Sequence, residues 1–419
     1  MRRQSAGQRS AAGHIWDSIV ALGPEPDEHR YDISDPNGAL RELLAGSTLR
    51  PDNSGPTTPY VPDLVSWPDV SQPPAPLLGL LGERGPAALR KWRRHVLRDS
   101  DEARQLRGGA CPQGPCTDLA LLRSPVDCAS FRGAMVERRM LVFSPAHGRR
   151  GNMGIFSVPK KSGRLRVIFD ARLANCAFAD APRARLPSAS AWGRLETGGA
   201  RISATSADLD AAFYHVQVPE GMGEYFALPS IAAKYLAPLG ITVAGMTGED
   251  LVLPQVVVLP MGFSWVLHLC QTVPQTSLCR AGFSPEALAL DGHCGRQFSD
   301  DPASVVGAGY VDNYFVLGGS AKQVGQRLQA VTDDLVRHGH AVHELQAHSQ
   351  DRDFLGLSLR EGRWLSPRTR NIWRLRAAIR AATRRQAISG FLLRVLAGHI
   401  TWALLLRREL LCILNATYA

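Results

Sequence analysis

Two aspartates carry the clearest chemical signal in the chain. Asp208 ends an apolar run in the segment Ser206-Ala-Asp-Leu-Asp-Ala-Ala-Phe-Tyr214, and Asp312 lies in Tyr310-Val-Asp-Asn313 between two apolar runs. Burying a carboxylate among apolar residues is costly unless a cation or hydrogen-bond donors compensate its charge. Two carboxylates that converge on a shared divalent ion would remove this cost, and their hard oxygen atoms favour Mg²⁺. In the alternative interpretation, which is the simpler one for each residue alone, Asp208 caps a helix and Asp312 occupies an ordinary turn position.

The segments around these aspartates predict the elements that must position them. Alternating apolar residues predict a hairpin over 154–159 and 165–169, whose turn is basic. A strand over 201–208 is followed by a helical turn at 211–215, and two strand-like arms over 307–317 surround the second aspartate. The remaining predictions are amphipathic helices over 77–106 and 324–338, short strands over 354–359 and helices from 371 onward. Because strands and helices mix without regular alternation, the predicted fold class is α+β.

Composition limits the class of protein. The 419 residues suggest two or three domains, and 45% hydrophobic residues exclude a wholly disordered chain. A formal net charge of +10 favours a polyanionic partner such as nucleic acid, although an arginine-rich codon bias gives the same balance. The eight cysteines lack the spacing of a zinc site, which indicates reduced thiols in an intracellular protein of the cytoplasm or nucleus. We expect no membrane partner, because the most apolar stretch, 391–406, is interrupted by Arg394 and His399 and predicts a buried helix.

Five motifs follow one another along residues 140–360. They are the basic hairpin with Lys160, Lys161, Arg166, Asp170 and Arg172, the Asp208 segment, Leu259-Pro-Met-Gly-Phe-Ser-Trp265 with Gln271, Tyr310-Val-Asp-Asn313, and Phe354-Leu-Gly-Leu357. In this order they resemble the motifs of reverse transcriptases of the retrotransposon and retroviral type. The resemblance implies an RNA-directed DNA polymerase that extends a primer on an RNA or DNA template with deoxynucleoside triphosphates, using Mg²⁺ or Mn²⁺.

The resemblance also implies the domains of a right-hand polymerase. We expect fingers at 140–205, a palm with inserted finger segments at 206–359 and a short, helical, thumb-like tail at 360–419. Residues 77–139 would form a helical extension, and residues 1–76 would be a flexible, Pro-rich region. Within it, 51–76 would be an extended linker or an irregular arm wrapped on another domain. Nothing in the tail resembles a ribonuclease H, protease or integrase domain, so we expect a fragment of a longer polyprotein or a decayed copy.

Site residues are carried over from the motifs. The resemblance makes Asp208, Asp312 and the backbone carbonyl of Leu209 the metal ligands. For the nucleotide it implies Lys160, Lys161 and Arg166 at the triphosphate, Ala211, Ala212 and Phe213 at the sugar, and Met261, Gly262 and Gln271 nearby. The Phe213 ring would exclude a 2′-hydroxyl by steric clash. For the nucleic acid it implies Tyr310, the hairpin residues Phe354, Leu355 and Gly356, and Arg172, which in the alternative only pairs with Asp170 and braces the fingers. The i,i+4 stripe of Arg376, Arg380 and Arg384 fits a phosphate backbone, or equally a solvated face enriched in arginine by codon bias.

Three positions depart from the family pattern. Asn313 stands where many relatives have a second aspartate, Met261 where retroviral relatives carry glutamine, and His343 where a lysine is common. They favour a rival hypothesis, in which the chain is an inactive relic that still binds nucleic acid. A third hypothesis, an RNA-dependent RNA polymerase, is disfavoured by Phe213.

Overall fold

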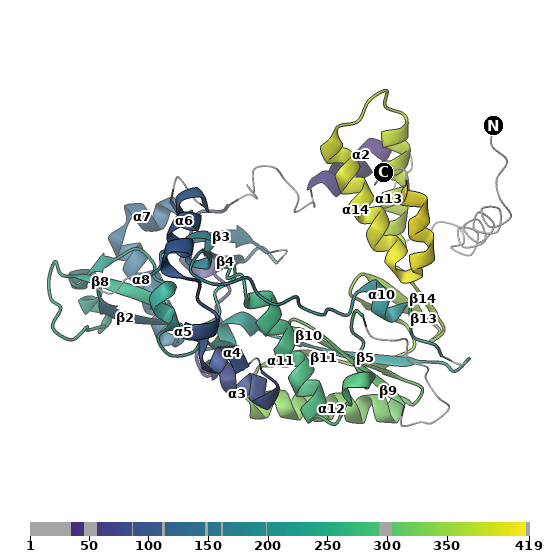
Figure 1. Cartoon of the computed structure of the whole chain (residues 1–419), viewed down its shortest axis with the longest axis horizontal. Helices are drawn as coiled ribbons and strands as arrows, with labels where there is room; N and C mark the ends of the chain where they lie inside the picture. The colour runs from purple at the N-terminus through teal and green to yellow at the C-terminus, as the bar shows by residue number, and fades with distance from the viewer. Residues whose placement is uncertain are drawn as a thin grey trace.

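The computed structural model describes residues 35–45, 57–85, 87–110, 114–146, 150–160, 162–197, 199–292 and 304–415. Helices and strands are mixed along this chain, which confirms the predicted α+β class (Figure 1).

A four-stranded antiparallel sheet in the order β11–β5–β10–β9 forms the centre of the fold. Its strands are β5 (Ser203–Leu209), β9 (Val305–Tyr310), β10 (Asn313–Gly318) and β11 (Val342–Ser349). Helices α11 (Val266–Arg280) and α12 (Ala321–Arg337) pack against one face of the sheet (Figure 1). The predicted helix over 324–338 is thus confirmed as α12, which begins after Ser320, whose side chain accepts a hydrogen bond from the Gln323 amide.

Apolar side chains from both faces of this sheet are buried. On the helical face, Val324, Leu328 and Val331 of α12 pack with Tyr314 and Val316 of the sheet. The opposite face is covered by α10 (Ala189–Trp192) and by a smaller sheet of β12 (Arg352–Phe354), β13 (Leu357–Arg360) and β14 (Trp364–Pro367). The central strands are therefore held between two apolar layers, which fixes the register of the residues at their ends.

A second region is built on the predicted hairpin. Strands β3 (Gly154–Pro159) and β4 (Leu165–Asp170) pair as expected, beside a sheet of β2 (Leu141–Pro145), β8 (Leu251–Val256) and β7 (Ile231–Ala232). The largest apolar core lies among β2, β3, β4, β8 and helices α3 (Leu77–Leu81), α4 (Ala87–Arg90), α5 (Trp92–His95), α7 (Leu119–Arg123) and α8 (Pro125–Glu137). Helix α6 (Ser100–Ala110) has no buried residue. The Tyr214 hydroxyl donates to the Val167 carbonyl at 2.8 Å and joins this region to the turn after β5.

The remaining short elements connect these regions. They are β1 (Ala75–Pro76), β6 (Val216–Gln217), α9 (Arg172–Asn175), η2 (Pro62–Leu64), η3 (Gly82–Arg84), η4 (Ala212–His215), η5 (Met222–Tyr225), η6 (Ala233–Tyr235), η7 (Ala237–Leu239) and η8 (Pro285–Ala287).

The single helix predicted over 77–106 is wrong. Helix α3 ends at Gly82, whose φ is +55°, and Lys91 between α4 and α5 has a ψ of +45°, outside the helical region. Leu97 then bridges to Phe178 in an extended pairing. These tertiary contacts override a helical pattern that is only moderately strong, and they break the segment into short helices.

The Pro-rich N-terminal region is ordered in the two parts that are described. Residues 57–76 form the wrapped arm of the two predicted alternatives: Thr58 bridges to Ser157 and Val65 to Leu165 of the β3–β4 hairpin, and Val65 is 1% exposed. Helix α2 (Pro36–Ala45) packs on the C-terminal helices. Both described parts therefore contact the rest of the protein, whereas the sequence predicts a flexible region over 1–76.

The C-terminal residues form a small helical bundle. Helix α13 (Thr369–Thr383) packs against α2 and α14 (Gly390–Leu404), and η9 (Leu405–Leu414) follows (Figure 1). In the described residues, Gly390–Leu414 is the one helical stretch whose length and composition would allow it to cross a membrane, and 28% of an 18-residue apolar window within it is buried. Its buried residues Leu392 and Leu396 lie in one apolar cluster with Leu40 of α2 and Leu375 of α13. The helix predicted to be buried over 391–406 is therefore buried on one side, and most of its residues are half-buried or exposed.

Candidate active site

The structure brings Asp208 and Asp312 to the same end of the central sheet. Asp208 lies near the end of β5, directly opposite Asn313 of β10. Asp312 lies in the tight turn that joins β9 to β10, where Asn313 is also paired with Tyr310. The Leu209 amide donates to the Asp312 carbonyl at 2.9 Å, so the backbone ties together two segments that are distant in the sequence.

The carboxylate of Asp208 is electrostatically unfavourable in this position. Burial raises its pKa to about 6, and the negative charges of Asp312 and Glu344 add to the shift. The Oδ1 atom of Asp208 is buried and has no hydrogen-bond partner. A nearby cation would stabilise the charged form of this carboxylate. The carboxylate oxygens of Asp208 and Asp312 therefore fit a divalent ion that prefers hard oxygen ligands.

The protein side chains present do not complete such a site by themselves. Among the described residues, no group of three His, Cys, Asp or Glu side chains is arranged to hold a metal ion. An ion held by Asp208 and Asp312 would take its other ligands from the Leu209 carbonyl, from water or from substrate oxygens. Mg²⁺ binds in this way when one or two carboxylates are available.

Asn313 is directed at its neighbour in the turn. Its Nδ2 group donates to the Asp312 Oδ1 atom at 2.8 Å. The amide therefore occupies one lone pair of the Asp312 carboxylate without adding negative charge. The turn therefore contributes one carboxylate, that of Asp312, and Asp208 of β5 contributes the second.

Gln271 holds the backbone of the turn from behind. It lies on α11 and is 1% exposed. Its Nε2 group donates to the Gly309 carbonyl at 2.7 Å, and its Oε1 atom accepts from the Val311 amide at 3.1 Å. Val311 needs this support, because its φ of +59° is rare for a β-branched residue. Both polar groups of Gln271 are used by the turn, so in this structure its side chain does not face a substrate.

The basic hairpin lies beside the N-terminal arm. The Lys160 ammonium group donates to the Ser66 hydroxyl at 3.1 Å, and Lys161 lies outside the described residues. Arg166 is exposed on β4, opposite Val158. Of the three predicted triphosphate-binding cations, the structure thus shows one exposed and one in contact with the arm.

Asp170 and Arg172 brace the end of β4. The Arg172 guanidinium donates through Nε and Nη2 to both Asp170 oxygens at 2.8 and 2.6 Å. The Cys116 amide donates to the same carboxylate at 2.7 Å, and these contacts together hold the Asp170 pKa below its usual range although burial opposes them. In this arrangement Arg172 stabilises the hairpin base.

The turn after β5 carries the residues predicted to face the sugar. Ala211 has a φ of +46° and directly precedes η4, in which Ala212 is buried and Phe213 is half-buried. Phe213 packs against the large core at its partly exposed edge.

Gly262 is required by packing within the protein. Its φ is +119°, and a Cβ there would meet the Phe169 carbonyl oxygen well inside van der Waals contact. The Phe169 amide donates to the Met261 carbonyl at 3.2 Å, and the Asn175 side chain bonds the Gly262 carbonyl at 2.9 Å and the Ser264 amide at 2.9 Å. The close approach that the sequence predicts at Gly262 is made to β4, and the structure shows Met261 next to it, half-buried.

Of the residues predicted to contact nucleic acid, Tyr310 lies closest to the aspartates. It ends β9 and is 36% exposed. Phe354 is 2% exposed and packs with its ring 5.0 Å from Trp192 and 5.6 Å from Phe315, so it is a core residue. Leu355 and Gly356 form the turn between β12 and β13, with positive φ at both.

The predicted arginine stripe lies on the exposed face of α13. Arg376 stacks on Trp373, with 4.6 Å from its guanidinium carbon to the ring centroid, while Arg380 and Arg384 are exposed. Leu375 and Ala378 are buried on the opposite side. The stripe belongs to the C-terminal bundle and not to the sheet edge that carries the aspartates (Figure 1).

Sequence reasoning named His343 only as a departure from the family pattern and missed Glu344. His343 of β11 lies opposite Asp208, and the next residue, Glu344, has a φ of +52° and raises the pKa of Asp208. No sequence signal places Glu344 there, because its position depends on an irregular strand register. The role of Asn175, which holds the Gly262 backbone, is signalled only by its place after the Asp170 motif.

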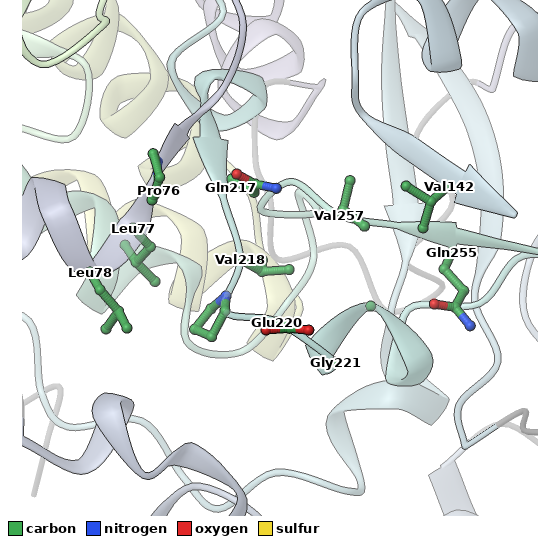
Figure 2. Close-up of a pocket in the computed structure, with 12 residues that line it drawn as sticks. Pro76, Leu77, Leu78, Val142, Gln217, Val218, Glu220, Gly221, Gln255 and Val257 are labelled. Atoms are coloured by element: carbon green, nitrogen blue, oxygen red, sulfur yellow. The ribbon is translucent and has the colours of Figure 1, made fainter. Parts of the chain in front are cut away.

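A pocket of about 400 Å³ lies away from the aspartates. Figure 2 shows Leu77 and Leu78 facing Val218 across it, with Val257 and Val142 on the side of β8 and β2. Glu220 and Gln217 are among its few polar lining groups. None of the lining residues belongs to the predicted site.

Comparisons with known proteins give distant results. No protein-family model matches the sequence, and no curated protein matches it. Among solved structures, the chain is similar to a foamy viral protease-reverse transcriptase in complex with double-stranded DNA, with 15% sequence identity and a TM-score of 0.44. The match covers 64% of this chain and 38% of that chain, so this chain spans well under two thirds of its neighbour's length. The structural similarity to a retroviral reverse transcriptase is therefore distant.

Proposed function

We propose that the chain is a template-directed DNA polymerase of the reverse transcriptase type, whose site uses two divalent ions, Mg²⁺ or Mn²⁺. The observation that carries the proposal is the meeting of Asp208 and Asp312 at one end of the central sheet. The buried Oδ1 atom of Asp208 supports the proposal, because it has no hydrogen-bond donor and a bound cation would compensate its charge.

In this proposal the side chains mainly hold and orient. Asp208, Asp312 and the Leu209 carbonyl are the ligands, and Gln271 fixes the turn from which Asp312 projects. When bound, divalent ions would lower the pKa of a primer hydroxyl and neutralise charge at the phosphates. The protein's own contribution is the geometry, which is the main requirement of phosphoryl chemistry.

Substrate contacts are proposed from exposure and charge. Arg166 is an exposed cation on a hairpin, and its planar guanidinium suits a bidentate contact to a triphosphate. Phe213 follows Asp208 in the turn that we propose lies beside the deoxyribose. Tyr310 and the arginine stripe on α13 would contact the primer-template, whose phosphates complement a chain of net charge +10.

The domain assignment belongs to the same proposal. The fingers would be residues 140–205 with the arm 57–76 along their hairpin, the palm would be 206–359, and the thumb would be the bundle of α13 and α14. Helix α2 would then be part of the thumb, since Leu40 and Leu43 pack into its apolar cluster.

Primer extension tests the proposal. The full chain is incubated with an RNA template, a DNA primer, deoxynucleoside triphosphates and Mg²⁺ or Mn²⁺. We expect extension by the wild type and none by Asp208→Asn or Asp312→Asn, with Asp210→Asn as a control that removes a neighbouring exposed carboxylate. Extension that persists in either of the first two variants would remove the assigned site.

A second candidate is an inactive relic that binds nucleic acid without copying it. The neutral Asn313 amide, which donates to Asp312, favours this candidate. It predicts salt-sensitive template binding with no incorporation by the wild type. If Asn313→Asp gained extension where the wild type has none, the lost charge would be identified as the cause.

A further inference from the structure

Trp364 is the most exposed large apolar side chain in the described part of the chain, with 69% of its surface accessible. It begins β14, the edge strand of the β12–β13–β14 sheet. The next residue, Leu365, packs into the apolar cluster around Phe354, so the alternation of the strand turns the indole outward. Covering an exposed indole with a ligand would be favourable, because it removes a large apolar surface from water.

Two arginines without acidic partners lie beside this indole. Arg363 precedes it in the turn between β13 and β14, and the Gly362 carbonyl accepts from the Ile202 amide at 2.8 Å, which brings Arg201 to the same turn. Both arginines are exposed, and neither is in an ion pair with an acid of the described chain. Glu361 is the opposing charge in the turn.

Two other arginines at this sheet are in ion pairs. Arg360, opposite Trp364 in the strand register, binds Asp353 at 2.9 Å, and Arg368 lies 3.5 Å from the same carboxylate. The Ser358 hydroxyl also donates to Asp353. Arg352 of β12 donates to the Gln346 side chain and the Ala347 carbonyl. Arg201 and Arg363 are thus exposed cations near Trp364 that are in no described ion pair.

We infer that Trp364, Arg363 and Arg201 form a binding surface for single-stranded nucleic acid. A base would stack on the indole, and the two guanidinium groups would contact the flanking phosphates. A protein partner would be expected to match an apolar or acidic patch, whereas an exposed indole near exposed arginines in a chain of net charge +10 matches a polyanion with flat bases.

The surface lies at the far end of the central sheet from the aspartates. Ile202 directly precedes β5, and Asp208 is near the end of that strand. At about 3.3 Å per residue the two ends are about 20 Å apart, which a stacked strand covers in about six nucleotides. The inference rests on the proposed function only for the class of partner, and it extends the proposed interface beyond the site itself.

The test measures binding and not synthesis. A fluorescently labelled oligonucleotide of about 15 nucleotides, as DNA and as RNA, is titrated with the full chain in EDTA without nucleotides, and its anisotropy is followed. We expect Trp364→Ala to weaken binding about 5- to 30-fold, and Trp364→Phe, which keeps a ring for stacking, to retain most of the affinity. Arg363→Gln should reduce the slope of log affinity against log salt by about 0.7.

Leu251→Ala is the matched control, because Leu251 is also more than half exposed but lies on β8. Equal affinity of Trp364→Ala and wild type, equal losses in both alanine variants, or no oligonucleotide binding by the wild type would overturn the inference. So would a Trp364→Ala variant that changes only self-association in size-exclusion chromatography. Asp312→Ala should keep full oligonucleotide binding, so that a failed polymerase assignment and a failed Trp364 surface give different results. If Trp364→Ala does not fold, the Phe and Arg363 variants decide.

Discussion

Replacing Gln271 by leucine should loosen the turn that carries Asp312. The substitution removes both hydrogen bonds of the buried amide and leaves the Gly309 carbonyl and the Val311 amide without partners. Each unpaired buried group costs about 1–3 kcal/mol, and burial of the leucine side chain offsets about 1 kcal/mol of the sum. We therefore expect the free energy of unfolding to fall by about 1–5 kcal/mol, with the strained Val311 backbone free to relax.

Urea unfolding measures the loss of stability. Titration with Mn²⁺ measures the loss of ion affinity that we expect when the turn carrying Asp312 is loosened. Gln275→Leu is the matched control, since Gln275 lies one turn further along α11 and its Nε2 group donates only to the Arg185 carbonyl, at 3.1 Å in an exposed position. The control should change stability by less than about 1 kcal/mol and leave ion affinity unchanged. Equal effects of the two substitutions, or an unchanged ion affinity in Gln271→Leu, would refute the assignment of Gln271 as the residue that positions the turn.

Three further results are expected. The pKa of Asp208 is raised to about 6 in the folded protein, so the unfolded state loses this proton first as pH rises. The free energy of unfolding of the wild type without divalent ions should therefore fall between about pH 4 and 6. Urea titrations of Asp208→Asn should not show this fall. The variant should then be more stable at pH 7 by about 1 kcal/mol, because solvent screening of the half-exposed carboxylate reduces the roughly 3 kcal/mol that two pKa units would give; equal stability at pH 7 would contradict the raised pKa. Gly262→Ala should lower the thermal midpoint markedly, since its φ is positive and a Cβ there collides with the Phe169 carbonyl. The control Gly398→Ala should leave the thermal midpoint unchanged, because a Cβ there has no neighbour within 4 Å. Val311→Gly should raise stability by up to about 1 kcal/mol by relieving the left-handed backbone, and a clear loss would show that its side-chain packing dominates.

The elements next to the aspartates follow from the sequence, because local pattern and tertiary packing agree there. The alternation over 154–169 gives β3 and β4, and the two apolar arms over 307–317 give β9 and β10. A tight turn with an aspartate between two apolar strands has few other solutions in an antiparallel sheet. The pairing of Asp208 with Asn313 then needs only β5 to join that sheet.

The rest depends on contacts that a linear pattern does not contain. Gln271 bonds the turn because α11 crosses β9 closely, where a Cβ on Gly309 would strike Pro274. Glu344 reaches Asp208 through an irregular register of β11, and Phe354 is buried because a second sheet covers the central one. In each case the partner lies tens of residues away, and side-chain type alone does not distinguish a substrate contact from a structural one.

The binding of Mn²⁺ measured by electron paramagnetic resonance tests the central claim most directly, because it reports the shared ion site without requiring catalysis. We expect Asp208→Asn and Asp312→Asn each to abolish the tight ion binding of the wild type, and Asp210→Asn to retain it. If the single variants each kept wild-type affinity, or if Asp210→Asn lost as much as they did, Asp208 and Asp312 would not share an ion.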